Sequence, residues 1–192
     1  MITKDNPKPS FAGSARRWWA ALQDKRADGA PNRGGDRAAL ARLRRAATPL
    51  QALEEPAVIS LYRQLGFGEH QLNHRLPRVA VVAAVLAHIR SDAAPHESGR
   101  RQSFAEMLGR DERPLMSALR FKRLLAASND QDLLNGFRRA VALAGGRNID
   151  VGDLAASLLD WSEKCRMRWA FHYYRAGMAA PKLDAAPTDD EE

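Results

Sequence analysis

Residues 76–89, LPRVAVVAAVLAHI, are the stretch that decides the fold. On a helix, its apolar side chains surround most of the circumference, which is typical of a central helix buried among others. Pro77 fits a first helical turn, where the missing backbone N–H would be unpaired in any case. We therefore expect a helix from Pro77 to Ile89. The stretch is interrupted by His88 and is shorter than the roughly 20 residues that a bilayer span requires, so we expect no membrane segment.

Three helices are expected before this stretch, over residues 14–26, 36–47 and 56–66. Ser14 and Asp36 are residue types that cap helix N-termini, and Pro56 fits a first turn. Pro49 ends the second helix, because the residue before a proline avoids the helical region. Trp19 is a candidate for an aromatic side chain that faces outward.

Four more helices are expected after it, over residues 103–109, 114–127, 129–144 and 150–172. Pro114 is expected to begin the second of these, with Leu115 and Leu119 on its buried side. Asp150 is expected to begin the last and longest, whose apolar residues recur every three or four positions as far as His172. The alternation typical of strands is almost missing. The sequence thus predicts an all-α fold, a compact helical bundle of about eight helices.

The composition also suggests boundaries along the chain. A polar stretch from Ser91 to Gln102 contains Pro95 and Gly99 and is the best internal boundary. We expect a flexible N-terminus (1–13), an N-terminal helical lobe (14–92), a loop (93–102), a C-terminal helical lobe (103–177) and a disordered acidic tail (178–192).

Charge is distributed unevenly. The 192 residues include 30 Lys and Arg against 23 Asp and Glu, a net charge of +7. Residues 178–192 hold one base and five acids, a net charge of −4, which leaves +11 for residues 1–177. Arginine dominates the bases, with 24 Arg to 6 Lys, and its guanidinium pairs with two phosphate oxygens at once. A GC-rich coding bias explains that ratio equally well, but the charge itself indicates a polyanionic partner.

The motifs of common enzyme classes are missing from the sequence. The segment GGDR at residues 34–37 lacks the Lys and Ser/Thr of a phosphate-binding loop, and no H-E-x-x-H, G-x-S-x-G or cysteine pair occurs. His70 and His74 are spaced to share a helix face but have no obvious third metal ligand nearby. The single Cys165 excludes an internal disulfide. We therefore expect no catalytic residues, cofactor or metal, and a cytoplasmic protein, since the N-terminus has no hydrophobic signal region.

Basic residues recur on the helices that carry an apolar stripe. Spread over several elements, they suit a groove that follows a phosphate backbone better than a single helix that contacts bases. The alternative is that each is one exposed arginine on a solvated helix face. The candidates are Arg44 and Arg45, Arg100 and Arg101, Arg120 and Arg123, and Arg138 and Arg139.

Six segments, taken in order, resemble a known family. They are Trp18-Trp19, GDRAAL at 35–40, Arg44-Arg45, LRFKRLL at 119–125, residues 154–161 and RWAFHYY at 168–174. In this order they look like the CasB small subunit of type I-E CRISPR surveillance complexes (Cascade). The resemblance extends from about Ser14 to Arg175.

The resemblance implies an all-α subunit that is not itself a nuclease. It implies four partners: the other Cascade subunits, a guide RNA, a second copy of the same subunit and the target DNA. A basic face would hold the displaced DNA strand and stabilise the R-loop during antiviral defence. By position, the resemblance indicates Arg44, Arg45, Arg120, Arg123, Arg138 and Arg139, with Arg100 and Arg101 of the loop as an addition.

Two other classes of protein stay open on the residues alone. Helices over 114–127 and 130–144, joined by a short turn, fit a helix-turn-helix transcriptional regulator with Arg138 and Arg139 on its recognition helix. Gln131 and Asn135 are then the few residues available for base edges. The other class is a protein-interaction scaffold whose charge serves only solubility.

Overall fold

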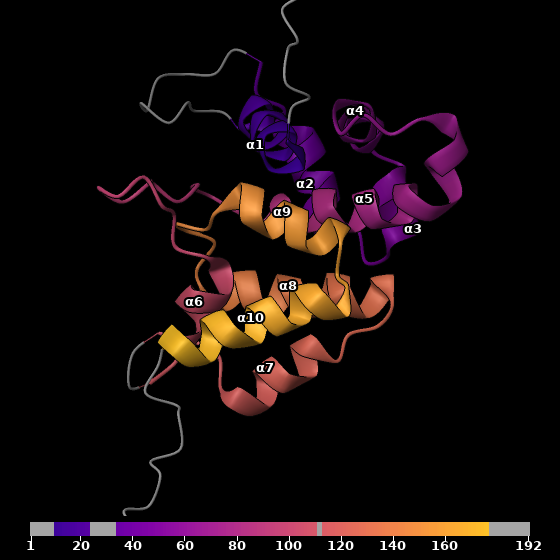
Figure 1. Ribbon diagram of the computed structural model, residues 1–192. Helices are drawn as coiled ribbons and strands as arrows, with labels where there is room; N and C mark the ends of the chain where they lie inside the picture. The colour runs from indigo at the N-terminus through magenta and orange to yellow at the C-terminus, as the bar shows by residue number, and fades with distance from the viewer. Residues whose placement is uncertain (1–9, 24–33, 111–112, 177–192) are drawn as a thin grey trace, which may run out of the picture.

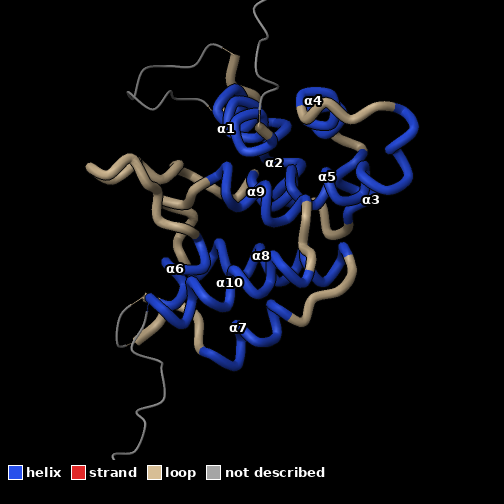
Figure 2. Tube along the Cα trace, viewed as in Figure 1, coloured by secondary structure: helices blue, strands red, loops and turns tan. Residues whose placement is uncertain are grey.

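The computed structural model describes residues 10–23, 34–110 and 113–176, which form ten α-helices and one 3-10 helix (Figure 2). The predicted all-α fold is confirmed, and the described residues contain no strand beyond one isolated bridge. The expected helix end near Arg26, the flexible start over residues 1–9 and the acidic tail lie outside the described residues. The helices are α1 (Phe11–Leu22), α2 (Arg37–Arg45), α3 (Pro49–Leu53), α4 (Pro56–Gln64), η1 (Glu69–Gln71), α5 (Leu72–Leu86), α6 (Phe104–Gly109), α7 (Ala118–Leu125), α8 (Asp130–Leu143), α9 (Val151–Leu159) and α10 (Glu163–Ala176).

Helix α5 forms the centre of the core. Every residue from Val79 to Leu86 is 0% exposed. Helices α2, α3, α4, α8 and α9 all pack against it. Burial of each Val or Leu side chain is worth about 1.5–3 kcal/mol, so the apolar stretch is a major source of stability.

The other helices lie above and below α9 in Figure 1. Helices α1 to α5 gather in the upper half of the view, and α6, α7, α8 and α10 lie in the lower half. Helix α9 packs against α1 and α5, and α8 also packs against α5. Helices from both sides of the 93–102 loop therefore share one core, and the division into two lobes stays a prediction.

The loop between α5 and α6 projects to the left in Figure 2 and is fastened at its base. Asp92 accepts hydrogen bonds from Arg16 Nε (2.8 Å), Arg101 Nη1 (3.2 Å) and the backbone N–H of Val151 (2.9 Å). Arg16 Nη2 also donates to Asp150 (2.6 Å), whose carboxylate caps α9. Arg16 of α1 therefore joins the loop to the first turn of α9.

Helix α10 packs closely against α6 and α7. The Tyr173 ring stacks on the Phe121 ring with centroids 3.8 Å apart, and its hydroxyl donates to the Met116 carbonyl (2.5 Å). Gly109 ends α6 so near to α10 that a Cβ atom there would lie 2.2 Å from the carbonyl oxygen of Tyr173. The α6–α10 contact thus depends on a position that excludes any side chain.

Three predicted helix starts are wrong, at Ser14, Pro77 and Pro114. Helix α1 is capped by Ser10, whose hydroxyl accepts from the N–H of the third helical residue (3.1 Å), and Ser14 is buried inside the helix. Helix α5 begins five residues before Pro77. The proline removes only the donor to the Asn73 carbonyl, and Asn73 is exposed, so water can replace that donor.

The buried side of α7 also differs from the prediction. The helix begins four residues after Pro114, and Leu115 and Leu119 are 46% and 61% exposed. Phe121 and Leu124 are buried instead, because the aromatic stack with α10 fixes the rotation of α7.

The predicted long last helix is two helices, α9 and α10. The chain leaves the helical conformation at Asp160 (φ −126°) and turns so that α9 covers α1 and α5 while α10 covers α6. His172 is only half-buried, and Tyr173 takes the core position beside it. Trp19, expected to face outward, is buried, and its Nε1 donates to the Ile89 carbonyl (3.4 Å). This split and the short α3 explain why ten α-helices replace the expected eight or so.

We expect Gly109→Ala to destabilise the protein by about 1–3 kcal/mol, because the added methyl group forces α6 and α10 apart. Urea unfolding followed by circular dichroism measures this. Gly13→Ala is the matched control, since a Cβ atom there meets the Ser10 hydroxyl at 3.2 Å and the Arg17 guanidinium at 3.6 Å, and no backbone atom of another described helix within 3.6 Å. Equal stability of the two variants would contradict the packing assignment.

Candidate nucleic-acid interface

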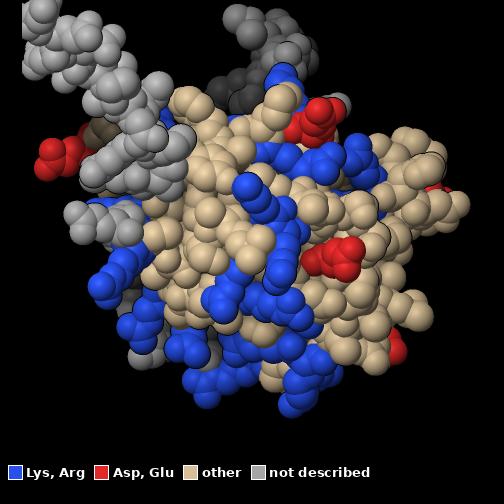
Figure 3. Space-filling view, turned by 90° about the horizontal axis from the view of Figure 1, so that it is seen from below, with Lys and Arg blue, Asp and Glu red and all other residues tan. Residues whose placement is uncertain are grey.

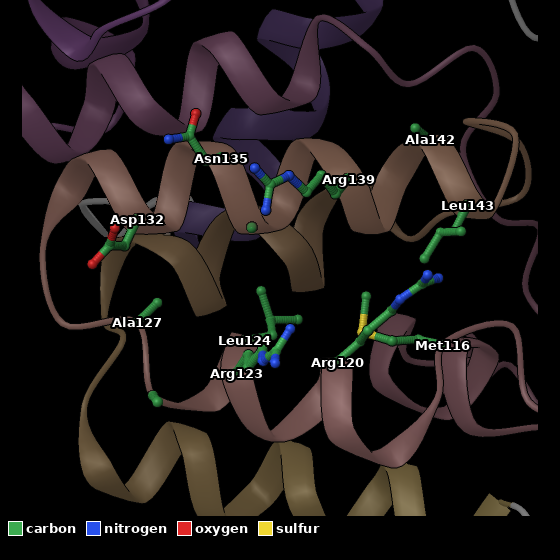
Figure 4. A pocket seen from close by; sticks show the side chains of 12 residues that line it. Met116, Arg120, Arg123, Leu124, Ala127, Asp132, Asn135, Arg139, Ala142 and Leu143 are labelled. Carbon is green, nitrogen blue, oxygen red and sulfur yellow. The ribbon is translucent and has the colours of Figure 1, made fainter.

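A groove of about 940 Å³ runs between α7 and α8. Figure 4 shows side chains from both helices directed into it: Arg120 and Arg123 from α7, and Arg139 from α8. We call these three residues the groove arginines. Met116 and Leu124 also line the groove but are almost fully buried, and Leu143 contributes exposed apolar surface.

The two groove arginines of α7 are oriented by the packing of the side chains next to them in the sequence. Arg120 and Arg123 are three residues apart and lie on one side of the helix, as the helical period requires. Phe121 is fully buried against α10, and Leu124 is directed toward α8. The arginine side of α7 is thereby fixed toward the groove.

Helix α8 presents a polar edge to the groove and an apolar face to the core. Asp132, Asn135 and Arg139 recur at helical spacing along the groove, while residues such as Phe137 on the other side are buried. Gly136 lies on the groove edge, where a Cβ atom would come within 2.9 Å of the Leu124 side chain. The missing side chain lets the two helices approach closely.

The charge in the groove is largely uncompensated. None of the groove arginines forms a hydrogen bond or ion pair with another described residue. Asp132 is the one acid among the described residues that line the groove, and its carboxylate accepts from Asn129 Nδ2 (2.8 Å) at the start of α8. Three positive charges beside an apolar surface create a potential that attracts phosphate.

Two other predicted arginines bind the ends of helices, and we call them the capping arginines. Arg138 donates to the carbonyls of Ala46 (2.6 Å) and Leu43 (2.8 Å), in the last turn of α2. Arg44 Nε donates to the carbonyl of Ala87 at the end of α5 (2.6 Å). These carbonyls have no partner within their own helices, and a cation also complements the negative end of the helix dipole. Both side chains therefore join α2, α5 and α8.

The three remaining predicted arginines lie away from the groove. Arg100 pairs with Glu106 (2.5 Å), and Arg101 pairs with Asp92 at the base of the loop. Arg45 is exposed on α2 and does not line the groove. The structure thus brings together Arg120, Arg123 and Arg139 of the eight predicted residues.

The groove itself was not predicted from the sequence. Met116 and Gly136 shape it, yet neither carries a charge. A usable signal was present in the spacing of Asp132, Asn135 and Arg139 along one edge of α8. Figure 3, seen from the side of α7, shows Lys and Arg gathered over the lower part of this face, with few Asp or Glu.

Within residues 10–23, 34–110 and 113–176, no three His, Cys, Asp or Glu side chains lie close enough to hold a metal ion. None of the described helices has the length and apolar character needed to cross a membrane.

The fold and the groove define an all-helical protein with a cationic surface groove. Residues 39–174 match the family model of the CRISPR-associated protein Cse2, so the chain belongs to the Cse2 family. Cse2 is the CasB small subunit of type I-E CRISPR systems, which confirms the resemblance drawn from the sequence.

One solved structure supports the fold independently. A chain of the crystal structure of E. coli Cascade bound to a PAM-containing dsDNA target superposes with a TM-score of 0.60. The two chains are 18% identical, and the match covers 86% of this chain and 97% of the other. No curated protein matches the chain.

His88 lies beside the capping arginines and is partly buried. Its Nε2 has no hydrogen-bond partner among the described atoms. Burial, then the positive charges of Arg138 and Arg44, lower the pKa of His88 from 6.5 to about 4. The folded protein therefore keeps this ring neutral at pH values where an unfolded chain would protonate it.

Arg138→Ala should lower the free energy of unfolding by about 2 kcal/mol, because it leaves two carbonyls of α2 without a charged donor. Arg139→Ala, one residue along α8, should change it by less than about 0.5 kcal/mol, since that side chain is exposed and unpaired. Urea unfolding of both variants provides the measurement. An equal loss in both would show that Arg138 does not cap α2.

The low pKa of His88 predicts an acid-sensitive stability. Between pH 6.5 and about 4, the unfolded chain binds a proton at His88 that the folded protein does not, so the free energy of unfolding falls as the pH falls. His88→Gln should lose less stability than the wild type between pH 7 and pH 4.5. His70→Gln, at an exposed position, is the matched control for the loss of one imidazole. Parallel curves for all three proteins would contradict the assignment.

Proposed function

We propose that the chain is a noncatalytic structural subunit of a type I-E Cascade, and that it binds nucleic acid independently of sequence and stabilises the R-loop. The observation that carries the proposal is the α7–α8 groove, where the groove arginines have no partner among the described residues. Membership of the Cse2 family supports the assembly with other Cascade subunits and a guide RNA.

The chemistry of the groove favours a single strand. Each guanidinium can pair with two oxygens of a phosphate, and binding releases the counterions that the phosphates had condensed. Leu143, which is 39% exposed, adds apolar surface that can contact the faces of bases. Those faces are accessible in a displaced strand and stacked inside a duplex, so the displaced strand of the target DNA is the better ligand.

Modest contacts are sufficient for the proposed role. An RNA–DNA heteroduplex is about as stable as the DNA duplex it replaces, so strand exchange is nearly balanced. A few backbone contacts to the displaced strand shift that balance toward the open R-loop. Base pairing selects the sequence, and the groove needs no base-specific donor.

Assembly requires a second surface, which we place on α10. Met167 and Phe171 are 61% and 60% exposed and are four residues apart, on one side of the helix. The Arg175 guanidinium lies over the Phe171 ring, 5.7 Å from its centroid. Contiguous exposed apolar side chains of this kind suit a contact with another subunit. Pairing of two copies within the complex is part of the same proposal.

The arrangement of α8 does not favour a helix-turn-helix regulator. Gln131 Nε2 donates to the carbonyl of Ala47 (2.9 Å) and to Asn135 Oδ1 (3.3 Å). These hydrogen bonds occupy the amide that would have to contact base edges. The helix also packs against α5 along its length, as a core element does.

The variant with all three groove arginines changed to Ala should bind single-stranded DNA about 10- to 100-fold more weakly at 0.1 M salt. Three lost phosphate contacts should also reduce the salt slope, log K against log[salt], by about 2. Fluorescence anisotropy with a labelled oligonucleotide of mixed sequence measures both quantities, and circular dichroism verifies the fold.

The matched control removes three exposed arginines from α1, α2 and α4, namely Arg17, Arg37 and Arg63. It loses the same charge far from the groove and should bind DNA much more tightly than the groove variant. Equal losses in the two variants would show that net charge, and not the groove, holds the strand. A preference of about a thousandfold for one duplex would instead indicate a sequence-specific regulator.

A further inference from the structure

Residues 177–192 follow α10 and are acidic. They contain five carboxylates, Asp184, Asp189, Asp190, Glu191 and Glu192, against the single base Lys182. The family match ends at residue 174, so neither the fold nor the family accounts for this segment.

Helix α10 ends beside the groove. Tyr173, three residues before the end of α10, stacks on Phe121 of α7, and its hydroxyl binds the carbonyl of Met116. Met116 is itself a groove residue. In Figure 1 the yellow end of α10 lies next to the beginning of α7. The chain therefore leaves the last helix at the Met116 end of the groove.

Every acidic residue of the segment is linked to α10 by enough chain to reach the groove. Asp184 is eight residues after Ala176, a maximum of about 26–29 Å, and Asp189 is thirteen residues after it, a maximum of about 43–47 Å. Helix α7, with eight residues, is about 12 Å long. A segment tethered at one end of the groove has an effective concentration there of the order of millimolar.

We infer that the acidic segment 177–192 binds the α7–α8 groove of its own chain and competes there with nucleic-acid phosphate. Carboxylates form the same two-pronged contacts with guanidinium groups as phosphates do. Five of them complement three arginines that have no described partner. The inference rests on the proposed function only in taking nucleic acid as the competitor.

The segment would act as a weak, reversible substitute for DNA. It covers the groove when the subunit is free, and this lowers binding to nucleic acid at large. In an assembled complex the displaced strand presents many phosphates at high local concentration and replaces the segment. The apparent affinity for DNA is the intrinsic affinity multiplied by the fraction of molecules whose groove is open.

The test neutralises the segment by changing its three Asp residues to Asn and its two Glu residues to Gln. If the segment occupies the groove in about 80% of free molecules, this variant binds single-stranded DNA about 5-fold more tightly at low salt. The gain should disappear near 0.3 M salt, where exposed charges are screened. Unchanged affinity at low salt would overturn the inference.

A double-variant cycle separates groove occupancy from a change in net charge. Neutralising the segment should have no effect on DNA binding in the protein that lacks the groove arginines. It should still tighten binding about 5-fold in the control variant without Arg17, Arg37 and Arg63, whose groove is intact. Equal gains in both backgrounds would mean that the segment acts only through overall charge, which overturns the inference.

Contact between the segment and the groove can also be measured without DNA, and this test does not depend on the proposed function. A nitroxide on Pro187→Cys can be attached selectively because Cys165 is buried. At low salt it should broaden the amide signals of α7 and the groove edge of α8 more than those of α4, and removal of the groove arginines should abolish the difference. Uniform broadening would overturn the inference. Selective broadening without any loss of DNA binding in the groove variant would instead overturn the proposed function.

Discussion

The burial of residues 79–86 of α5 on every side is the constraint on which the rest of the structure depends. A helix without a polar face cannot lie at the surface, so other helices must cover its whole circumference. Helices α2, α3, α4, α8 and α9 meet this requirement from both halves of the sequence. Their ends then fall close to one another, where carbonyl groups lose access to water. Arg44 and Arg138 satisfy these carbonyls, so the capping arginines follow directly from the burial of α5.

The arginines therefore serve two purposes that composition cannot separate. Arg138 and Arg139 are adjacent in the sequence and differ by about 100° around α8. The first is directed inward to the end of α2, and the second is directed into the groove. A count of basic residues assigns both to a polyanion. Only the packing of α8 against α5 shows which of the two is available to a ligand.

Much of the fold could be predicted from periodicity and caps. Asp36 caps the helix it was expected to cap, and Asn129 caps the helix expected over residues 129–144, because these short polar side chains fix the first turn locally. The errors arose where tertiary contacts decide. Pro77 did not end or begin a helix, and the period that continues through Asp160 gave no sign of the turn between α9 and α10. The spacing of Asp132, Asn135 and Arg139 indicated one polar edge of α8, but the groove itself could not be predicted, since it depends on the distance between two helices and on the missing side chain of Gly136.

The manner in which α7 is attached has a mechanical consequence. Eight residues are too few for a helix to be stable alone, and α7 is anchored mainly by Phe121 and Leu124. One wall of the groove therefore depends for its position on two side chains packed against α10 and α8, while the opposite wall belongs to a helix that packs against α5. A change at Phe121 or Tyr173 would thus alter the shape of the groove, although neither residue lines it.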